Sequence, residues 1–221
     1  MRLDEILDDP EDTWHEDRRL MNDLPDDTQD AIEQLRQRKN HKMMGAGINA
    51  YAGTNDYENF GDVHRISSDS DGGAIFLDVV ASNPHYANNP FLPKVKSIKR
   101  SGETQTTIVE RLVPFKTPAI LNSGPLMKAV WDSYFVQSWE EAKPEWGYNP
   151  MLDVASVIDE AVKLPDPSSI IKHPKLIEAV QLIQQLVKTY DIPMTDLHNQ
   201  NVMWRMSVYS PQLVITDPIA L

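Results

Sequence analysis

The stretch Asp196-Leu197-His198-Asn199-Gln200-Asn201-Val202-Met203-Trp204 is followed closely by Leu213-Val214-Ile215-Thr216-Asp217-Pro218. The apolar runs 202–204 and 213–215 are typical of short strands, and we expect them to pair as a hairpin. Such a hairpin brings Asn201 and Asp217 side by side, with Asp196 in the loop that precedes it. The stretch therefore predicts two carboxylates and one amide at one end of a hairpin.

These three side chains are of the kinds that phosphoryl transfer requires. Mg²⁺ prefers hard oxygen ligands and completes its shell with water and phosphate oxygens, so Asn201 and Asp217 together fit a metal site. A further carboxylate must orient the attacking hydroxyl and accept its proton, and Asp196 fits that role. His198 is expected to order the loop through hydrogen bonds, because no other His or Cys lies near it in the sequence. The alternative is structural, since Asp and Asn are common turn residues and a carboxylate can simply end a strand.

The segment before this stretch predicts helices. Between Pro174 and Tyr190 the apolar residues recur at i, i+3, i+4 and i+7, and Pro174 suits the first turn of a helix. Residues 150–164 show a similar apolar face. Residues 116–150 are rich in Trp and Pro, and we expect irregular or short helical structure there.

The first half of the chain reads as strands. Residues 43–52 carry Gly45 and Gly47 between apolar residues, which indicates a strand, a tight turn and a strand. Further strands are expected over 63–66, 95–100 and 106–112, the last two as a hairpin. Residues 74–80 predict a short helix, and 83–93 a loop marked by three prolines. Strands first and helices later indicate an α+β chain.

Composition excludes several classes of protein. The chain has 221 residues with a hydrophobic fraction of 41%, enough to bury a core, and it contains no run of about 18 apolar residues that could span a membrane. It contains no cysteine, which excludes disulfides and thiolate metal sites. The formal net charge of −12 argues against direct binding to nucleic acid.

The acidity is concentrated at the N-terminus. Residues 1–33 hold 13 acidic and 3 basic side chains, a net of −10 out of the total of −12. A helix is expected over about residues 26–40, with acids first and bases last, and Leu3, Ile6 and Leu7 suggest another short turn. The segment is either a solvated leader or an acidic surface that mimics nucleic acid or docks on a basic partner.

The pattern Asp196-Leu197-His198 with Asn201, followed by Ile215-Thr216-Asp217-Pro218, resembles the catalytic and metal-binding loops of the protein-kinase-like fold. It is similar to aminoglycoside-phosphotransferase-type kinases and to the short early protein kinases of podovirus- or autographivirus-type phages. The resemblance implies a reduced bilobal fold, with an antiparallel N-lobe sheet and a minimal helical C-lobe. The implied division is an acidic helical leader (1–42), an N-lobe (43–115) and a C-lobe (116–221).

The resemblance also assigns roles in the first half. Gly45 and Gly47 resemble a glycine-rich loop over nucleotide phosphates. Arg65 stands where a phosphate-pairing Lys is expected, and Asp78 is the only nearby acid in the following helix to pair with it. Glu110 lies where strand five runs into a hinge that holds adenine. The catalytic pair would be Asp196 and His198.

The implied function is an ATP- and Mg²⁺-dependent serine/threonine protein kinase of a phage. Its expected partners are host proteins of transcription or RNA processing, and its expected location is the host bacterial cytoplasm. One alternative is a catalytically impaired kinase-like protein that inhibits a host enzyme by occupancy. Another is an acidic decoy in which the leader matters most.

Overall fold

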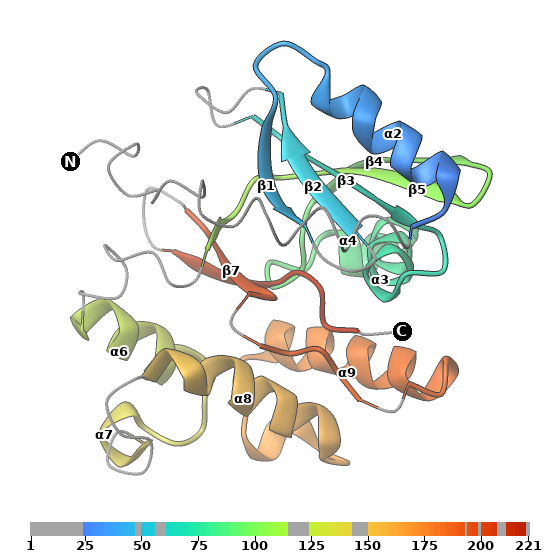
Figure 1. Cartoon of the computed structure of the whole chain (residues 1–221). Coiled ribbons are helices and arrows are strands. Elements are labelled where there is room, and N and C mark those ends of the chain that lie inside the picture. Colours follow the sequence, from blue (N-terminus) through green and yellow to red (C-terminus); the bar gives the residue numbers. More distant parts are fainter. Residues whose placement is uncertain are drawn as a thin grey trace. The chain divides into compact units, whose positions relative to one another are not determined.

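The computed structural model describes residues 24–46, 50–55, 61–114, 124–142, 150–192, 194–198, 200–206 and 211–219. The chain divides into two compact units (Figure 1). The sheet unit contains the described residues of 24–88 and 93–111. The helical unit contains residues 89–92 and the described residues of 112–219.

The sheet unit is built on one antiparallel sheet of five strands in the order β1-β2-β3-β5-β4. The strands are β1 (Lys42–Ala46), β2 (Ala50–Thr54), β3 (Val63–Ser68), β4 (Val95–Ser101) and β5 (Thr104–Val109). Neighbouring strands pair antiparallel, and the register of β1 shifts between Met43 and Gly45. Gly102, in the turn between β4 and β5, has a φ of 57°, a backbone conformation that favours glycine.

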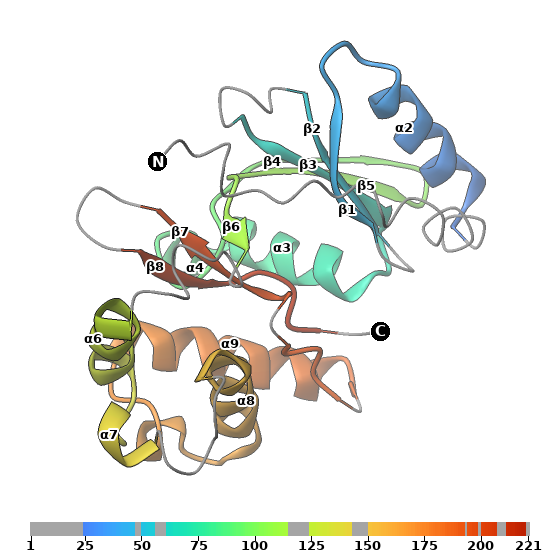
Figure 2. The same cartoon turned by 60° about the vertical axis from the view of Figure 1, so that its left-hand side comes forward.

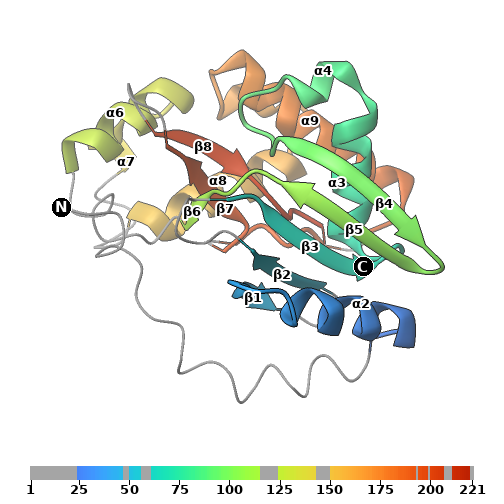
Figure 3. The same cartoon turned by 90° about the horizontal axis from the view of Figure 1, so that it is seen from above.

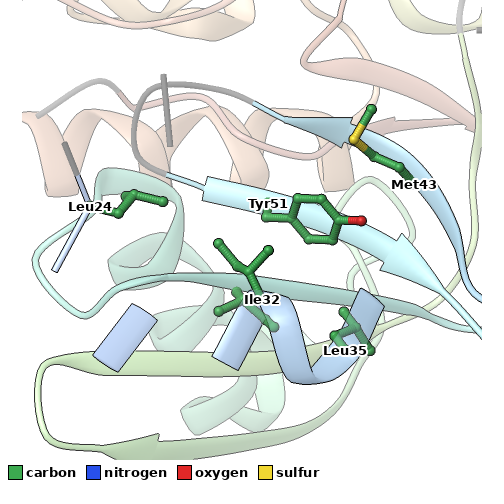
Figure 4. Packing of buried hydrophobic residues seen from close by; sticks show 6 residues of the cluster. Leu24, Ile32, Leu35, Met43 and Tyr51 are labelled. Atoms are coloured by element: carbon green, nitrogen blue, oxygen red, sulfur yellow. The ribbon is translucent and has the colours of Figure 1, made fainter. Parts of the chain in front are cut away.

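Helix α2 (Asp26–Arg36) covers one face of this sheet. Two acids lie in its first turn and Arg36 in its last, which complements the helix dipole. Its buried residues Ile32 and Leu35 pack with Tyr51 of β2, which is 1% exposed (Figure 4). The complete cluster consists of Leu24, Ile32, Leu35, Met43, Tyr51 and Ile66.

Helix α3 (Gly72–Ser82) lies on the opposite face of the sheet, and the short helix α4 (Pro84–Ala87) follows it (Figure 3). Gln105 of β5 points to this side, because its Nε2 donates to the Ala74 carbonyl at 3.0 Å. Thr104, the neighbour of Gln105, points to the other side and bonds Thr28 of α2 at 2.9 Å. Because neighbouring side chains along β5 point to opposite faces of the sheet, this one strand contacts both α2 and α3.

The helical unit contains α6 (Gly124–Tyr134), α7 (Trp139–Ala142), α8 (Pro150–Lys163), the 3₁₀ turn η4 (Pro167–Ser169) and α9 (Pro174–Thr189). A small antiparallel sheet, β6-β7-β8, lies above these helices in Figure 2. Its strands are β6 (Val113–Pro114), β7 (Val202–Arg205) and β8 (Gln212–Ile215). The core of this unit includes Trp131, Trp204 and Ile158, each of which is at most 1% exposed.

The α+β class is confirmed, as are the strands, the two long C-terminal helices and the C-terminal hairpin. The helix expected over 26–40 ends at Arg36, and Asn40 in the following turn has a φ of 62°. The expectation of a continuous loop over 83–93 is wrong, because Asn83 caps α4 through its side chain. The short turn expected around Leu3 lies outside the described residues. Among the described residues, no helix has both the length and the apolar character needed to cross a membrane.

Candidate functional site

The C-terminal hairpin places the predicted metal ligands on adjacent strand ends. β7 and β8 pair with Val202 opposite Ile215. The pairing continues by one residue, because the Thr216 N–H donates to the Asn201 carbonyl at 2.9 Å. Asp217 is therefore the next residue along the chain from Thr216, the partner of Asn201.

A second set of backbone contacts closes the loop that carries Asp196. The Asp196 N–H donates to the Pro218 carbonyl at 2.9 Å, and Thr195 forms an isolated β-bridge with Ile219. Residues 195–201 are thus bonded to residues 216–219 at both ends. Asp196 and Asp217 belong to one closed backbone framework in the helical unit.

The Asn201 amide is oriented by Asp196. Its Nδ2 donates to the Asp196 carbonyl at 2.7 Å and to the Asp196 carboxylate Oδ2 at 3.0 Å. Because both of these acceptors are oxygens, the amide nitrogen must face Asp196. The Asn201 amide oxygen, which would be the metal ligand, is then directed away from that carboxylate.

His198 completes the ordering of this loop. Its Nδ1 accepts a hydrogen bond from the Gln200 N–H at 3.1 Å. The Nε2 atom lies 3.3 Å from the Asp196 Oδ1 and 3.2 Å from the Asn201 Nδ2. Asp196 therefore has Asn201 beside one carboxylate oxygen and His198 beside the other.

Asp217 follows the buried strand β8 and is half-buried, with its Oδ1 atom buried. Within the described ranges, no three His, Cys, Asp or Glu side chains gather closely enough to hold a metal ion by themselves. The oxygen donors of Asn201 and Asp217 suit Mg²⁺, which usually takes only one or two protein carboxylates and fills its shell with phosphate oxygens and water. The residues present thus fit a metal that arrives with a phosphate substrate.

In the sheet unit, Arg65 has an acidic partner other than the expected one. Its guanidinium bonds the Asp71 Oδ2 at 2.6 Å and the Ser67 Oγ at 2.8 Å. The same Asp71 oxygen accepts the Ala74 N–H at 2.9 Å and so caps α3. Asp78 instead pairs with Arg100 at 3.1 Å, so the expectation that Asp78 serves Arg65 is wrong.

The other residues predicted to contact the nucleotide are placed as follows. Gly45 lies in β1 opposite Ala52 of β2, and Gly47 lies outside the described residues. The Glu110 carboxylate accepts the Lys94 N–H at 2.8 Å, while the Glu110 N–H donates to the Lys94 carbonyl at 3.0 Å. The Glu110 side chain thus holds the backbone of Lys94, the residue just before β4, by a hydrogen bond.

Sequence reasoning missed Asp71 and Gln105. Asp71 immediately precedes an apolar helical run, which is the usual signal of a helix N-cap and could have identified it. Gln105 has no comparable signal, because it reads as one polar residue in an alternating strand. Its Nε2 donates both to the Ala74 carbonyl and, at 3.2 Å, to the Thr107 Oγ1.

The loop residues Asp196, His198 and Asn201 are brought into mutual contact, and the hairpin adds the Thr216–Asp217 segment to them. Arg65 and Glu110 instead form hydrogen bonds within the sheet unit, to Asp71 and Lys94 respectively. The chain matches no protein-family model and no curated protein sequence.

Proposed function

We propose that this chain is an ATP- and Mg²⁺-dependent phosphotransferase of the protein-kinase-like type, which transfers phosphate to Ser or Thr hydroxyls of proteins. One observation carries the proposal. The Asp196 carboxylate is contacted by Asn201 and His198 inside a loop that is bonded on both sides to the segment around Asp217. The Asp196 side chain is 43% exposed, and a polar side chain lies within 3.3 Å of each of its carboxylate oxygens.

In the proposed mechanism, the Asp196 carboxylate orients the substrate hydroxyl and accepts its proton. The hydroxyl oxygen forms a bond to the γ-phosphorus as the bond to the β,γ-bridging oxygen breaks, and ADP leaves. The Asn201 amide oxygen and the Asp217 carboxylate would hold the metal. Bound Mg²⁺ would neutralise charge on the phosphates.

His198 acts on the reaction through Asp196. Its Nε2 atom lies 3.3 Å from the Asp196 Oδ1 and 3.2 Å from the Asn201 Nδ2, so the ring lies against both side chains. The ring and the Asn201 amide thus lie on two sides of the Asp196 carboxylate and limit its movement. His198 thereby orients the base and does not accept the proton itself.

From the resemblance alone, we assign phosphate contacts to Gly45, Gly47 and Arg65. Asp71 and Ser67 hold the Arg65 guanidinium in a defined orientation. The Glu110 side chain is given a structural role only, because its carboxylate holds Lys94. The resemblance to phage kinases extends the proposal to host proteins as substrates, in the host cytoplasm.

The test uses the full chain with radiolabelled ATP, Mg²⁺ and a general protein substrate such as casein, with autophosphorylation followed in parallel. We expect Asp196→Asn and Asp217→Asn each to reduce transfer by about 10²- to 10⁴-fold, the usual contribution of such groups. Asp191→Asn is the matched control. Asp191 is exposed, and its φ of 51° is one that Asn tolerates well.

Transfer that survives both substitutions would overturn the proposal. A wild-type chain that is stabilised by Mg²⁺–ATP in a thermal-shift assay but transfers no phosphate would favour the catalytically impaired binding protein. A chain that shows neither transfer nor nucleotide binding would favour the acidic decoy.

A further inference from the structure

A side chain of helix α8 contacts the catalytic loop, which is the segment 195–201 around the proposed base Asp196. The Thr195 hydroxyl donates a hydrogen bond to the Asp159 Oδ1. Asp159 lies between Ile158 and Ala161, which are both fully buried, so the backbone of α8 is firmly packed at this point. The second Asp159 oxygen is bonded by Lys163, one helical turn further along α8.

Thr195 is the residue immediately before the proposed base. Its backbone is bridged to Ile219, and its side chain is held by Asp159. The next N–H, that of Asp196, bonds Pro218. The chain entering the catalytic loop is therefore held by backbone contacts on one side and by α8 on the other.

We propose that Asp159 is a positioning residue for the proposed phosphotransfer, acting through the Thr195 hydroxyl to fix the place of the Asp196 carboxylate. The inference rests on the proposed function. Consecutive Cα atoms are 3.8 Å apart, so a change in the backbone at Thr195 is passed directly to Asp196. A displacement of about 1 Å at a reacting group can reduce a rate by about 10²-fold.

The contact between Lys163 and Asp159 does not contribute to the positioning of Asp196. The Lys163 side chain is 68% exposed, and exposed ion pairs of this kind contribute little. Lys163 therefore supplies a control that touches the same carboxylate from the solvent side. A substitution at Lys163 leaves the hydrogen bond from Thr195 in place.

The test compares kcat and KM of the full chain for a set of variants. Thr195→Val and Asp159→Ala each remove the hydrogen bond, and we expect kcat to fall about 10- to 100-fold with KM for ATP changed by less than about twofold. Thr195→Ser and Asp159→Asn keep a donor and an acceptor and should retain most of kcat. Lys163→Gln should match the wild type. The double variant Asp159→Ala/Thr195→Val should be no slower than either single variant, because both remove one contact.

A second readout is independent of transfer. The His198 ring signals in NMR, assigned with His198→Gln, report the contact between His198 and Asp196. They should shift in Thr195→Val and Asp159→Ala, but not in Thr195→Ser or Lys163→Gln, with the His41 signals unchanged in all. If the wild type transfers no phosphate, the proposed function fails while these shifts still decide the positioning role. Unchanged His198 signals in Thr195→Val, or equal kcat in Thr195→Val and Thr195→Ser, would overturn the inference.

Discussion

The Arg65–Asp71 pair and the Asp196–Asn201 pair both join a carboxylate to a side chain that donates hydrogen bonds, but they differ in their exposure to solvent. In the sheet unit, the side chains of Arg65 and Asp71 are 12% and 9% exposed. In the helical unit, the side chain of Asp196 is 43% exposed and that of its other neighbour, His198, is 47% exposed. The first pair is therefore largely buried, whereas the second is about half exposed to solvent.

The difference follows from what each carboxylate is bonded to. The Asp71 Oδ2 serves both the Arg65 guanidinium and the first turn of α3, so its contacts hold one helix on a sheet. Asp196 is bonded to the side chains of its own loop, and the loop is supported by backbone contacts and by α8. The loop that carries Asp196 is thus held by contacts to its backbone and to Thr195, while the Asp196 carboxylate is partly exposed to solvent.

The largest expected effect is a loss of unfolding free energy when the buried pair of Arg65 and Asp71 is broken. Arg65→Met leaves the buried Asp71 carboxylate without this cation, and breaking a buried pair in this way costs about 3–5 kcal/mol of unfolding free energy. Urea denaturation measures the loss. Arg100→Met is the matched control, because its partner Asp78 is 37% exposed and the pair should contribute no more than about 1 kcal/mol. Equal losses in the two variants would remove the distinction between the buried and the exposed pair.

A smaller effect is expected at Gly53. A Cβ built on Gly53 lies 2.3 Å from the His41 Cε1, so Gly53→Ala forces the imidazole ring to move. That ring bonds the Tyr51 hydroxyl at 2.7 Å and the Asn55 Oδ1 at 3.2 Å, and it cannot move without weakening these contacts. Overpacking of this kind costs about 1–3 kcal/mol. The penalty, measured by thermal denaturation, should largely disappear in a His41→Ala background, and a penalty of the same size there would show that the ring is not its cause.

The smallest effect concerns pH. Burial lowers the pKa of His41 and of His64 below the ordinary value of 6.5, and nearby Arg38 adds to the lowering for both. The unfolded chain therefore binds more protons than the folded chain as the pH falls through 6.5, so unfolding free energy should decrease from pH 7.5 to 5.5. Urea denaturation across this range measures the decrease, and His64→Gln should make it shallower. A stability that is level or rises toward pH 5.5 would contradict the burial of these rings.

The sequence predicted the elements whose signal is local. The apolar spacing of α9 and the paired apolar runs of β7 and β8 were enough to predict the helix and the hairpin, and the structure bonds Asn201 both to Asp196 and to Thr216, the neighbour of Asp217. Helix α4 was missed because Pro84 was read as part of a loop, although a proline in the first turn of a helix, after Asn83 as its cap, is a favourable start. Helix α6 lies in the segment that was expected to be irregular or only briefly helical. It is 11 residues long and begins with Gly124-Pro125.

The partner of Arg65 could not be predicted in the same way. Asp78 lies on α3, where a kinase-like pair would place the acid, but it pairs instead with Arg100 of β4. Asp71 is closer in sequence and stands at the turn between β3 and α3, and its pairing depends on the direction in which that turn carries the chain. Such a direction is a tertiary property, and the pattern of apolar residues does not encode it.

The shared oxygen of Asp71 also restricts which residue can occupy that position. Asn or Ser would keep the helix cap but would lose the charge, whereas Glu would keep the charge but would place it one methylene too far for the cap. Aspartate is the one standard side chain that meets both demands. Any substitution at position 71 should therefore weaken the ion pair with Arg65, the cap of α3, or both.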